Sequence, residues 1–183
     1  MSILSVYHQS TPDTPNKVLT HADDIAATLA EQGVHFEQRE LHERIRPGTA
    51  HEEVIDALRG NIDTLIADFG AGVVEVLSVH AEHPQKDELR AGLIDERRHA
   101  SRDVRFVASG RGLLNMRIGE YVYALVAERT DLVSLPAGTA QWFDIGEQPQ
   151  LVMLRLFETE EGRKPQLVGD DSARLYPGLD DTF

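Results

Sequence analysis

Two stretches decide the fold, ERRHASRDVRF at residues 96–106 and PAGTAQWFD at residues 136–144. The first contains the pattern R-x-H-x-x-x-D beginning at Arg97, and the second contains P-x-G-x-x-Q ending at Gln141. Within the first, Asp103 and Arg105 alternate with two apolar residues, which predicts a β-strand that turns a polar face toward one side.

The surrounding sequence is a series of short β-rich segments separated by turns. The candidate strands are 103–108, 113–118, 121–126, 132–135 and 151–157, with turns at Gly110-Arg111-Gly112 and Gly119-Glu120. Short strands at this spacing are typical of a β-sandwich or a small barrel, and a small barrel commonly holds a ligand inside.

The first half of the chain reads as α+β. Thr20 and Thr49 each have an acidic residue three positions later, so both predict the start of a helix, one over 20–32 and one ended by Gly70. A β-rich run covers 73–79 and a short helix follows Pro84. We predict one domain over 1–183: residues 1–95 pack on the barrel, residues 96–158 form its core, and residues 159–183 form a surface tail.

Composition narrows the range of partners. The 183 residues carry 18 basic and 31 acidic side chains, a net charge of −13, which repels phosphate backbones and anionic lipid. We therefore expect a small-molecule ligand, with no nucleic acid and no membrane as partner. The first residues lack the basic start and long apolar run of a secretion signal, so we expect a cytoplasmic location. The chain has no cysteine, which excludes disulfides and thiolate chemistry.

One charged residue lies on an otherwise apolar strand face. Arg155 shares its face with Leu151, Met153 and Phe157. Because an unpaired buried charge is very costly, this arginine needs either an internal salt bridge or an anionic or carbonyl ligand. The sequence leaves both readings open.

Taken together, several motifs resemble the acireductone dioxygenase family of cupins over nearly the full length. They are HPQK at 83–86, LR at 89–90, DVRF at 103–106, GRGL at 110–113, DLVSLPAGT at 131–139, WFD at 142–144, GDD at 169–171 and YP at 176–177. The resemblance implies an α+β, mainly β fold: a cupin barrel (a double-stranded β-helix of jelly-roll type) with N-terminal helices. It also implies an oxidoreductase that uses Fe²⁺ or Ni²⁺ to oxidise the acireductone of methionine salvage.

The residues at the family's metal-ligand positions are largely replaced. Carried over position by position, three histidines and a glutamate correspond to Arg97, His99, Gln141 and Asp103, so that His99 alone is unchanged. Arginine has no lone pair for a metal, and a glutamine carbonyl is a weaker ligand than imidazole. We expect no cofactor, and hypothesise an Arg97–Asp103 ion pair with Gln141 hydrogen-bonded nearby. The alternative is Fe²⁺ or Ni²⁺ held by His99, Asp103 and Gln141.

The resemblance also assigns a substrate pocket, to which we carry over Leu93, Arg105, Phe143 and Arg155. The leading prediction is a divergent family member that has lost the metal site and binds, or transforms without metal, a small polar or anionic molecule. His99 would be the general base, and Arg97 or Arg105 would stabilise an oxyanion. Whether the protein is an enzyme stays open, because a working dioxygenase with an altered metal site and a non-catalytic interaction protein are the alternatives.

Overall fold

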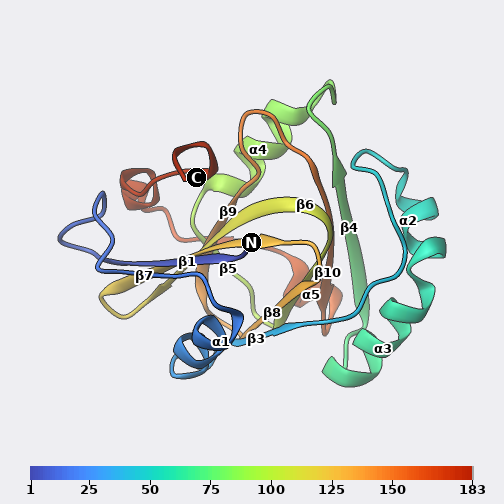
Figure 1. Cartoon of the computed structure of the whole chain (residues 1–183), viewed down its shortest axis with the longest axis horizontal. Coiled ribbons are helices and arrows are strands. Elements are labelled where there is room, and N and C mark those ends of the chain that lie inside the picture. Colours follow the sequence, from blue (N-terminus) through green and yellow to red (C-terminus); the bar gives the residue numbers. More distant parts are fainter. Residues whose placement is uncertain (183) are drawn as a thin grey trace.

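The computed structural model describes residues 1–182, and its central element is the long strand β6, Asp103–Ile118. The first half of β6 pairs with two strands and the second half with two others, so this one strand runs through both walls of the barrel (Figure 1). These partners are β8 (Asp131–Leu135) and β10 (Leu151–Phe157), then β7 (Tyr121–Glu128) and β9 (Ala140–Asp144).

Shorter strands extend both walls, and every recorded pairing is antiparallel. One wall has the order β11-β5-β9-β6-β7-β1-β2, while β4 joins β10 and β3 joins β8 in the other. The added strands are β1 (Ile3–His8), β2 (Lys17–Leu19), β3 (His35–Gln38), β4 (Val73–Val79), β5 (Arg97–Arg98) and β11 (Gln166–Leu167). The predicted mainly β cupin barrel is confirmed.

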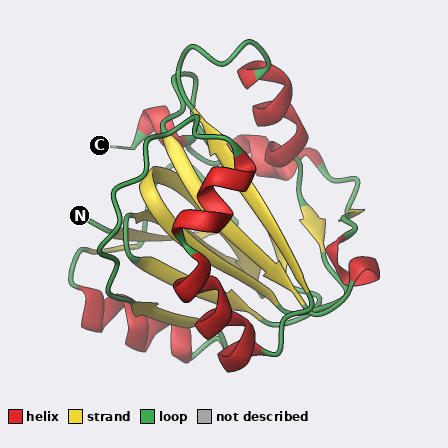
Figure 2. Ribbon diagram, turned by 90° about the vertical axis from the view of Figure 1, so that its right-hand side faces the viewer, coloured by secondary structure: helices red, strands yellow, loops and turns green. Residues whose placement is uncertain are grey.

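Helices cover the outside of the barrel. Figure 2 shows two of them, α2 and α3, lying across the strands of one wall. The helices are α1 (Ala22–Ala30), α2 (His51–Ala57), α3 (Arg59–Phe69), α4 (Lys86–Ile94) and α5 (Glu160–Arg163), with short 3₁₀ turns η1 (Asp171–Leu175) and η2 (Leu179–Asp181).

The apolar core has an inner and an outer part because side chains alternate along each strand. On β6, Leu114 and Met116 belong to the inner cluster, which also contains Phe143. Phe106 belongs instead to an outer cluster, packed beneath α2 and α3 with Leu58. The interior is therefore reserved for the side chains on one face of each strand, and the polar residues of the predicted site lie on that face.

Two details of the predicted helices are wrong. Neither α1 nor α2 has a side-chain cap: α1 begins after His21, and the Thr49 hydroxyl donates to the Arg46 carbonyl 2.6 Å away instead of capping α2. The second predicted helix is broken at Leu58 into α2 and α3. Its end at Gly70 is confirmed, where φ is 66° and glycine meets no steric penalty.

The predicted turn at Gly110-Arg111-Gly112 is also wrong, because β6 continues through these residues without ending. These glycines allow close packing. A Cβ on Gly110 would lie 1.7 Å from the Gln150 carbonyl oxygen, and one on Gly112 would lie 2.2 Å from the Phe143 ring. Gly110 also has φ of 73°, and the pairing with β10 shifts register nearby, so the strand bends here without ending.

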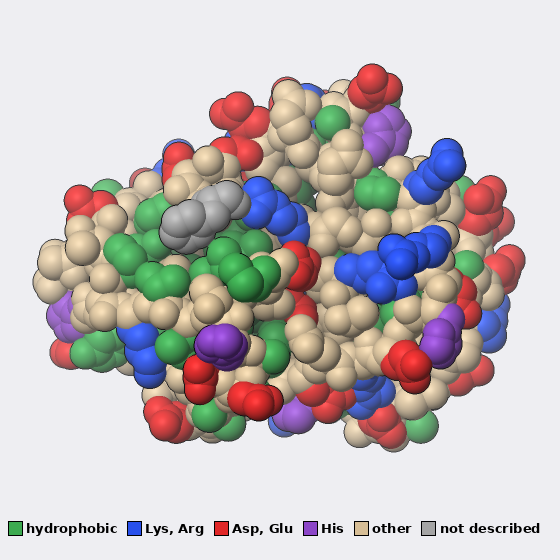
Figure 3. Space-filling model, in the orientation of Figure 1, with side chains coloured by type: hydrophobic (Ala, Val, Ile, Leu, Met, Phe, Trp, Pro, Cys, Tyr) green, Lys and Arg blue, Asp and Glu red, His purple; other side chains and the backbone are tan. Residues whose placement is uncertain are grey.

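The segment after residue 158 is not purely a surface tail. Ala173, Tyr176 and Leu179 are buried in a cluster with Trp142 of β9, so η1 and η2 cover the outer face of that wall. Phe183 lies outside the described residues. Acidic side chains are spread over the surface (Figure 3), in keeping with the net charge. Within residues 1–182, no helix has the length and apolar character needed to span a membrane.

Candidate functional site

The fold gathers the predicted site residues in the barrel interior. Arg97 on β5 is the backbone partner of Gln141 on β9, and Arg105 on β6 is the partner of Arg155 on β10. Asp103 precedes Arg105 by two residues, so both side chains lie on the same face of β6. All five are buried, and His99 is buried with them. The residues singled out from sequence spacing therefore lie close together in the folded protein.

The centre of the site is the Asp103 carboxylate, held between two arginines. Arg105 donates from Nη2 at 2.9 Å and from Nε at 3.4 Å, and Arg155 donates from Nη2 at 3.2 Å. Burial alone would raise the pKa of Asp103, but the charges and hydrogen bonds of the two guanidinium groups hold it well below its usual value. Asp103 is therefore ionised, with its lone pairs committed to arginine.

The hypothesised Arg97–Asp103 ion pair is wrong. Arg97 Nε donates 2.9 Å to the backbone carbonyl of Asp95, while Arg105 and Arg155 fill the positions around Asp103. The reason is geometric: Arg105 lies on the same strand face as Asp103, and Arg155 on β10 is the cross-strand partner of Arg105. Burial and the nearby Arg155 charge lower the pKa of Arg97.

The proposed hydrogen bond to Gln141 is wrong as well. Its side chain is 2% exposed, and neither Oε1 nor Nε2 has a hydrogen-bond partner among residues 1–182. Arg105 Nη1 and Arg155 Nε are buried and unpartnered in the same sense. A buried polar group without a hydrogen bond costs about 1–3 kcal/mol, so these unpartnered donors and the Gln141 acceptor favour a ligand or water that bonds to them.

His99 is held in a defined tautomer. Its Nδ1 lies 3.2 Å from the Gly162 carbonyl, which can only accept, so the proton is on Nδ1. The lone pair on Nε2 then faces Arg155 Nη2 at 3.3 Å and accepts from it. Burial lowers the pKa of His99, with Asp103 opposing the shift and Arg155 adding to it. The imidazole is neutral at pH 7, and its Nε2 lone pair already accepts the hydrogen bond from Arg155.

Within the buried part of the site, arginine outnumbers carboxylate. Three buried guanidinium groups, those of Arg97, Arg105 and Arg155, gather near the buried Asp103 carboxylate, and the partly exposed Glu75 carboxylate lies 3.9 Å from Arg155 Nη1. Burial first, and then the neighbouring Arg155 charge, lowers the pKa of Arg105 to about 10, which still leaves it protonated at pH 7. The field of this site attracts anions.

The cluster is reached from a hollow of about 530 Å³ between β4 and α4. Of the four predicted pocket residues, Arg155 and Leu93 line this hollow. Arg105 and Phe143 lie deeper, where the guanidinium stacks on the ring with 5.3 Å from its carbon to the ring centroid. The polar wall of the hollow includes Ser78, which no sequence pattern marks. It also includes His83 and Gln85 of the HPQK motif, to which no pocket role was assigned from the sequence.

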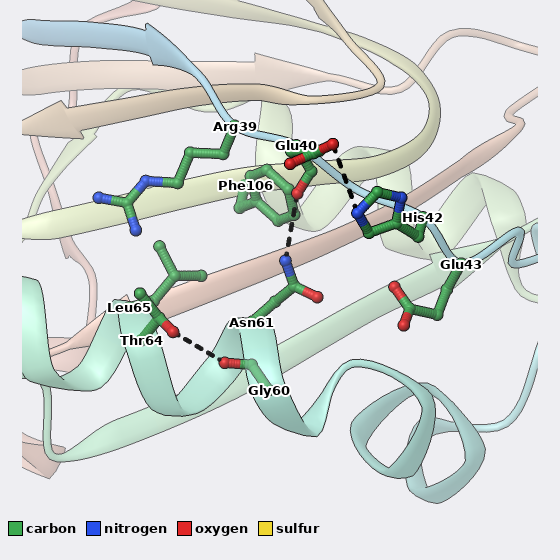
Figure 4. A pocket seen from close by; sticks show the side chains of 9 residues that line it. All are labelled: Arg39, Glu40, His42, Glu43, Gly60, Asn61, Thr64, Leu65 and Phe106. Carbon is green, nitrogen blue, oxygen red and sulfur yellow. Dashed lines mark hydrogen bonds and ion pairs between the residues drawn. The ribbon is translucent and has the colours of Figure 1, made fainter.

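A second hollow, of about 370 Å³, lies on the outer side of the barrel (Figure 4). Its polar groups are partnered and exposed: His42 faces Glu40, and Asn61 donates to the Glu40 carbonyl. Phe106 forms part of its lining, on the opposite face of β6 from Arg105. It has no contact with the arginine cluster and shows no chemistry of its own.

The residues at the cluster do not fit a divalent transition metal. Arg97 offers no lone pair, His99 Nε2 accepts from Arg155, and Asp103 is enclosed by two cations. No group of three or more His, Asp or Glu side chains within residues 1–182 is arranged to hold a metal ion. A +2 ion about 4 Å from one arginine, at an effective dielectric of 20, is repelled by roughly 8 kcal/mol.

The chain matches a known family and has full-length relatives. The sequence model of the ARD/ARD′ family matches residues 4–165. Proteins named acireductone dioxygenase from Pseudomonas fluorescens (Pf-5) and Pseudomonas syringae pv. syringae (B728a) are 53% and 52% identical to it. Each comparison covers 99% of this chain and 100% of the relative.

A solved structure shares the fold. It is described as acireductone dioxygenase from Bacillus anthracis with a cadmium ion in the active centre, and it superposes with a TM-score of 0.76 at 23% identity, covering 91% of this chain and 98% of the other. Family model, full-length relatives and fold agree: this chain belongs to the acireductone dioxygenase (ARD/ARD′) family of the cupin superfamily.

Proposed function

We propose that this member of the family uses its barrel site to bind a small, oxygen-rich organic anion, without a resident metal. The observation that carries the proposal is the buried cluster of Arg97, Arg105 and Arg155, in which Asp103 is the buried carboxylate and the partly exposed Glu75, 3.9 Å from Arg155, is a further acidic neighbour. The enediolate form of an acireductone belongs to this chemical class, in line with the names of the relatives.

The unpartnered atoms specify how such an anion would be held. Arg105 Nη1 and Arg155 Nε supply charged donors, and the Gln141 amide supplies a neutral donor and an acceptor. Charge-assisted hydrogen bonds of this kind stabilise an oxyanion strongly in a site from which water is excluded. His99 is neutral at pH 7, so it accepts a proton from a bound hydroxyl once the anion displaces Arg155 from Nε2.

A second candidate is a metal-dependent acireductone dioxygenase that uses His99, Asp103 and Gln141. The comparisons favour this candidate over the metal-free one, because relatives with that name are more than 50% identical over their full length. It requires Arg155 to leave His99 and Asp103, which would free the Nε2 lone pair of His99, and it also requires Arg105 to release the Asp103 carboxylate.

One experiment separates the candidates. Purified protein is analysed for transition metals, then given Fe²⁺ or Ni²⁺ without oxygen and assayed for oxygen-dependent loss of an acireductone. Stoichiometric metal with rapid turnover would establish the second candidate and end the metal-free proposal. Without metal, we expect calorimetry to show binding of a small dicarboxylate such as malonate.

The matched variants are Gln141→Leu and Asn61→Leu. Gln141→Leu removes an unpartnered buried amide, so the protein should fold normally while malonate affinity falls about tenfold. Asn61→Leu alters an amide in the outer hollow and should leave binding unchanged. Equal affinity in wild type and Gln141→Leu would contradict the role given to the amide.

A further inference from the structure

A second unpartnered amide lies outside the barrel interior, at Asn115. This side chain is 1% exposed, and neither Oδ1 nor Nδ2 has a hydrogen-bond partner among residues 1–182. Asn115 is on β6 next to Met116, whose side chain belongs to the inner core. Because successive side chains alternate, Asn115 faces outward, away from the arginine cluster.

The amide lines a pocket of about 330 Å³ between α4 and the C-terminal turns. In Figure 1 these turns, coloured red, lie beside α4 and β9. Trp142, the backbone partner of Asn115 on β9, and Tyr176 form an aromatic wall, with 5.7 Å between their ring centroids. The pocket therefore combines an apolar aromatic wall with one polar side chain that has no hydrogen-bond partner among residues 1–182.

The charged residues around this pocket already have partners. Arg90 Nε donates to Asp144 Oδ1 at 2.8 Å, and Asp144 also accepts from the backbone of Leu179 at 2.9 Å. Arg174 faces Asp95 at 3.4 Å, and Asp181 accepts from the Gly178 backbone at 2.9 Å. Both arginines are already paired with carboxylates, which does not favour an anion, and the unpartnered polar group is an uncharged amide, which favours a neutral ligand.

The geometry points to a neutral planar heterocycle whose edge carries an adjacent hydrogen-bond donor and acceptor, the class to which adenine belongs, and we propose this pocket as its binding site. An asparagine amide presents one acceptor and one donor side by side, and it pairs with such an edge through two hydrogen bonds. Trp142 and Tyr176, whose ring planes lie 50° apart, give such a ring an apolar surface to pack against. The proposal is independent of the anion site, because Asn115 and the arginines lie on opposite faces of the sheet.

The test uses a reporter that the chain already contains. Trp142 is the single tryptophan of the sequence and lines this pocket, so its fluorescence reports on occupancy. We expect adenine to give a saturable change in that fluorescence. 9-Methylpurine, which has neither the exocyclic amino group of adenine nor an N9–H donor beside N3, should bind about tenfold more weakly than 9-methyladenine. Equal affinity for the two would overturn the proposal, and so would the absence of a saturable change with adenine.

Substitution gives a second arm. Asn115→Leu should weaken adenine binding about tenfold or more, since one bidentate amide contact is lost. Thermal unfolding of Asn115→Leu should occur at or above the wild-type temperature, because the substitution removes a buried amide without a partner. Asn61→Leu is the matched control and should bind adenine as wild type does. Undiminished binding by folded Asn115→Leu contradicts the proposal, and the comparison of 9-methyladenine with 9-methylpurine decides the matter if that variant does not fold.

Discussion

Replacing Asp103 by asparagine tests the electrostatic account of the barrel site directly. The change keeps the shape of the side chain and removes its charge, which leaves Arg105 and Arg155 buried with no carboxylate between them. At an effective dielectric of 20, each attraction across about 3 Å amounts to roughly 5 kcal/mol before desolvation. Breaking a buried pair by removing one partner costs about 3–5 kcal/mol, and we expect a loss near 3 because asparagine still accepts one hydrogen bond.

The assay is urea unfolding at pH 7, followed by circular dichroism and analysed for the free energy of unfolding. Asp56→Asn is the matched control. Its ion pair with Arg59 has a similar 3.2 Å separation but is mostly exposed, so the loss should stay below about 0.5 kcal/mol. Added formate or phosphate should stabilise Asp103→Asn more than wild type, because an anion replaces the missing carboxylate. If Asp103→Asn lies within about 1 kcal/mol of wild type, the account of Asp103 as the charge centre is refuted.

Three further predictions follow from the site and its scaffold. Arg97→His, Asp103→Glu and Gln141→His together should give stoichiometric Fe²⁺ or Ni²⁺ binding by elemental analysis; failure would mean that these positions are not what excludes metal. Burial lowers the pKa of His99 below 6.5, so as the pH falls the unfolded state takes up a proton before the folded state does. The free energy of unfolding should therefore decrease as the pH falls below 6.5, by up to about 1.4 kcal/mol per pH unit. His99→Leu should flatten that dependence in urea titrations at several pH values, and an unchanged slope would assign it elsewhere. Gly110→Ala should cost more than about 2 kcal/mol in the same assay, since its Cβ would meet a backbone carbonyl 1.7 Å away, and a near-neutral result would contradict the close packing of the bend.

Much of the fold could be predicted because it depends on local pattern. The end of α3 at Gly70 and the strands β4 and β10 follow from turn chemistry and apolar runs. The glycines of β6 misled the prediction, since a glycine that permits close packing looks the same in sequence as one that forms a turn. The burial of Tyr176 was missed for a similar reason: its polar, turn-rich neighbourhood hides a contact with a strand far away in sequence.

Residue types and their spacing are enough to predict the family, the barrel and the side chains that meet inside it. How those side chains pair depends on strand register and packing, which the amino-acid sequence does not display. Asp103 forms ion pairs with Arg105 and Arg155 and not with Arg97, because strand register brings the first two guanidinium groups next to the carboxylate. The same holds for Gln141 and Asn115, whose unpartnered amides become visible only once every neighbour is in place.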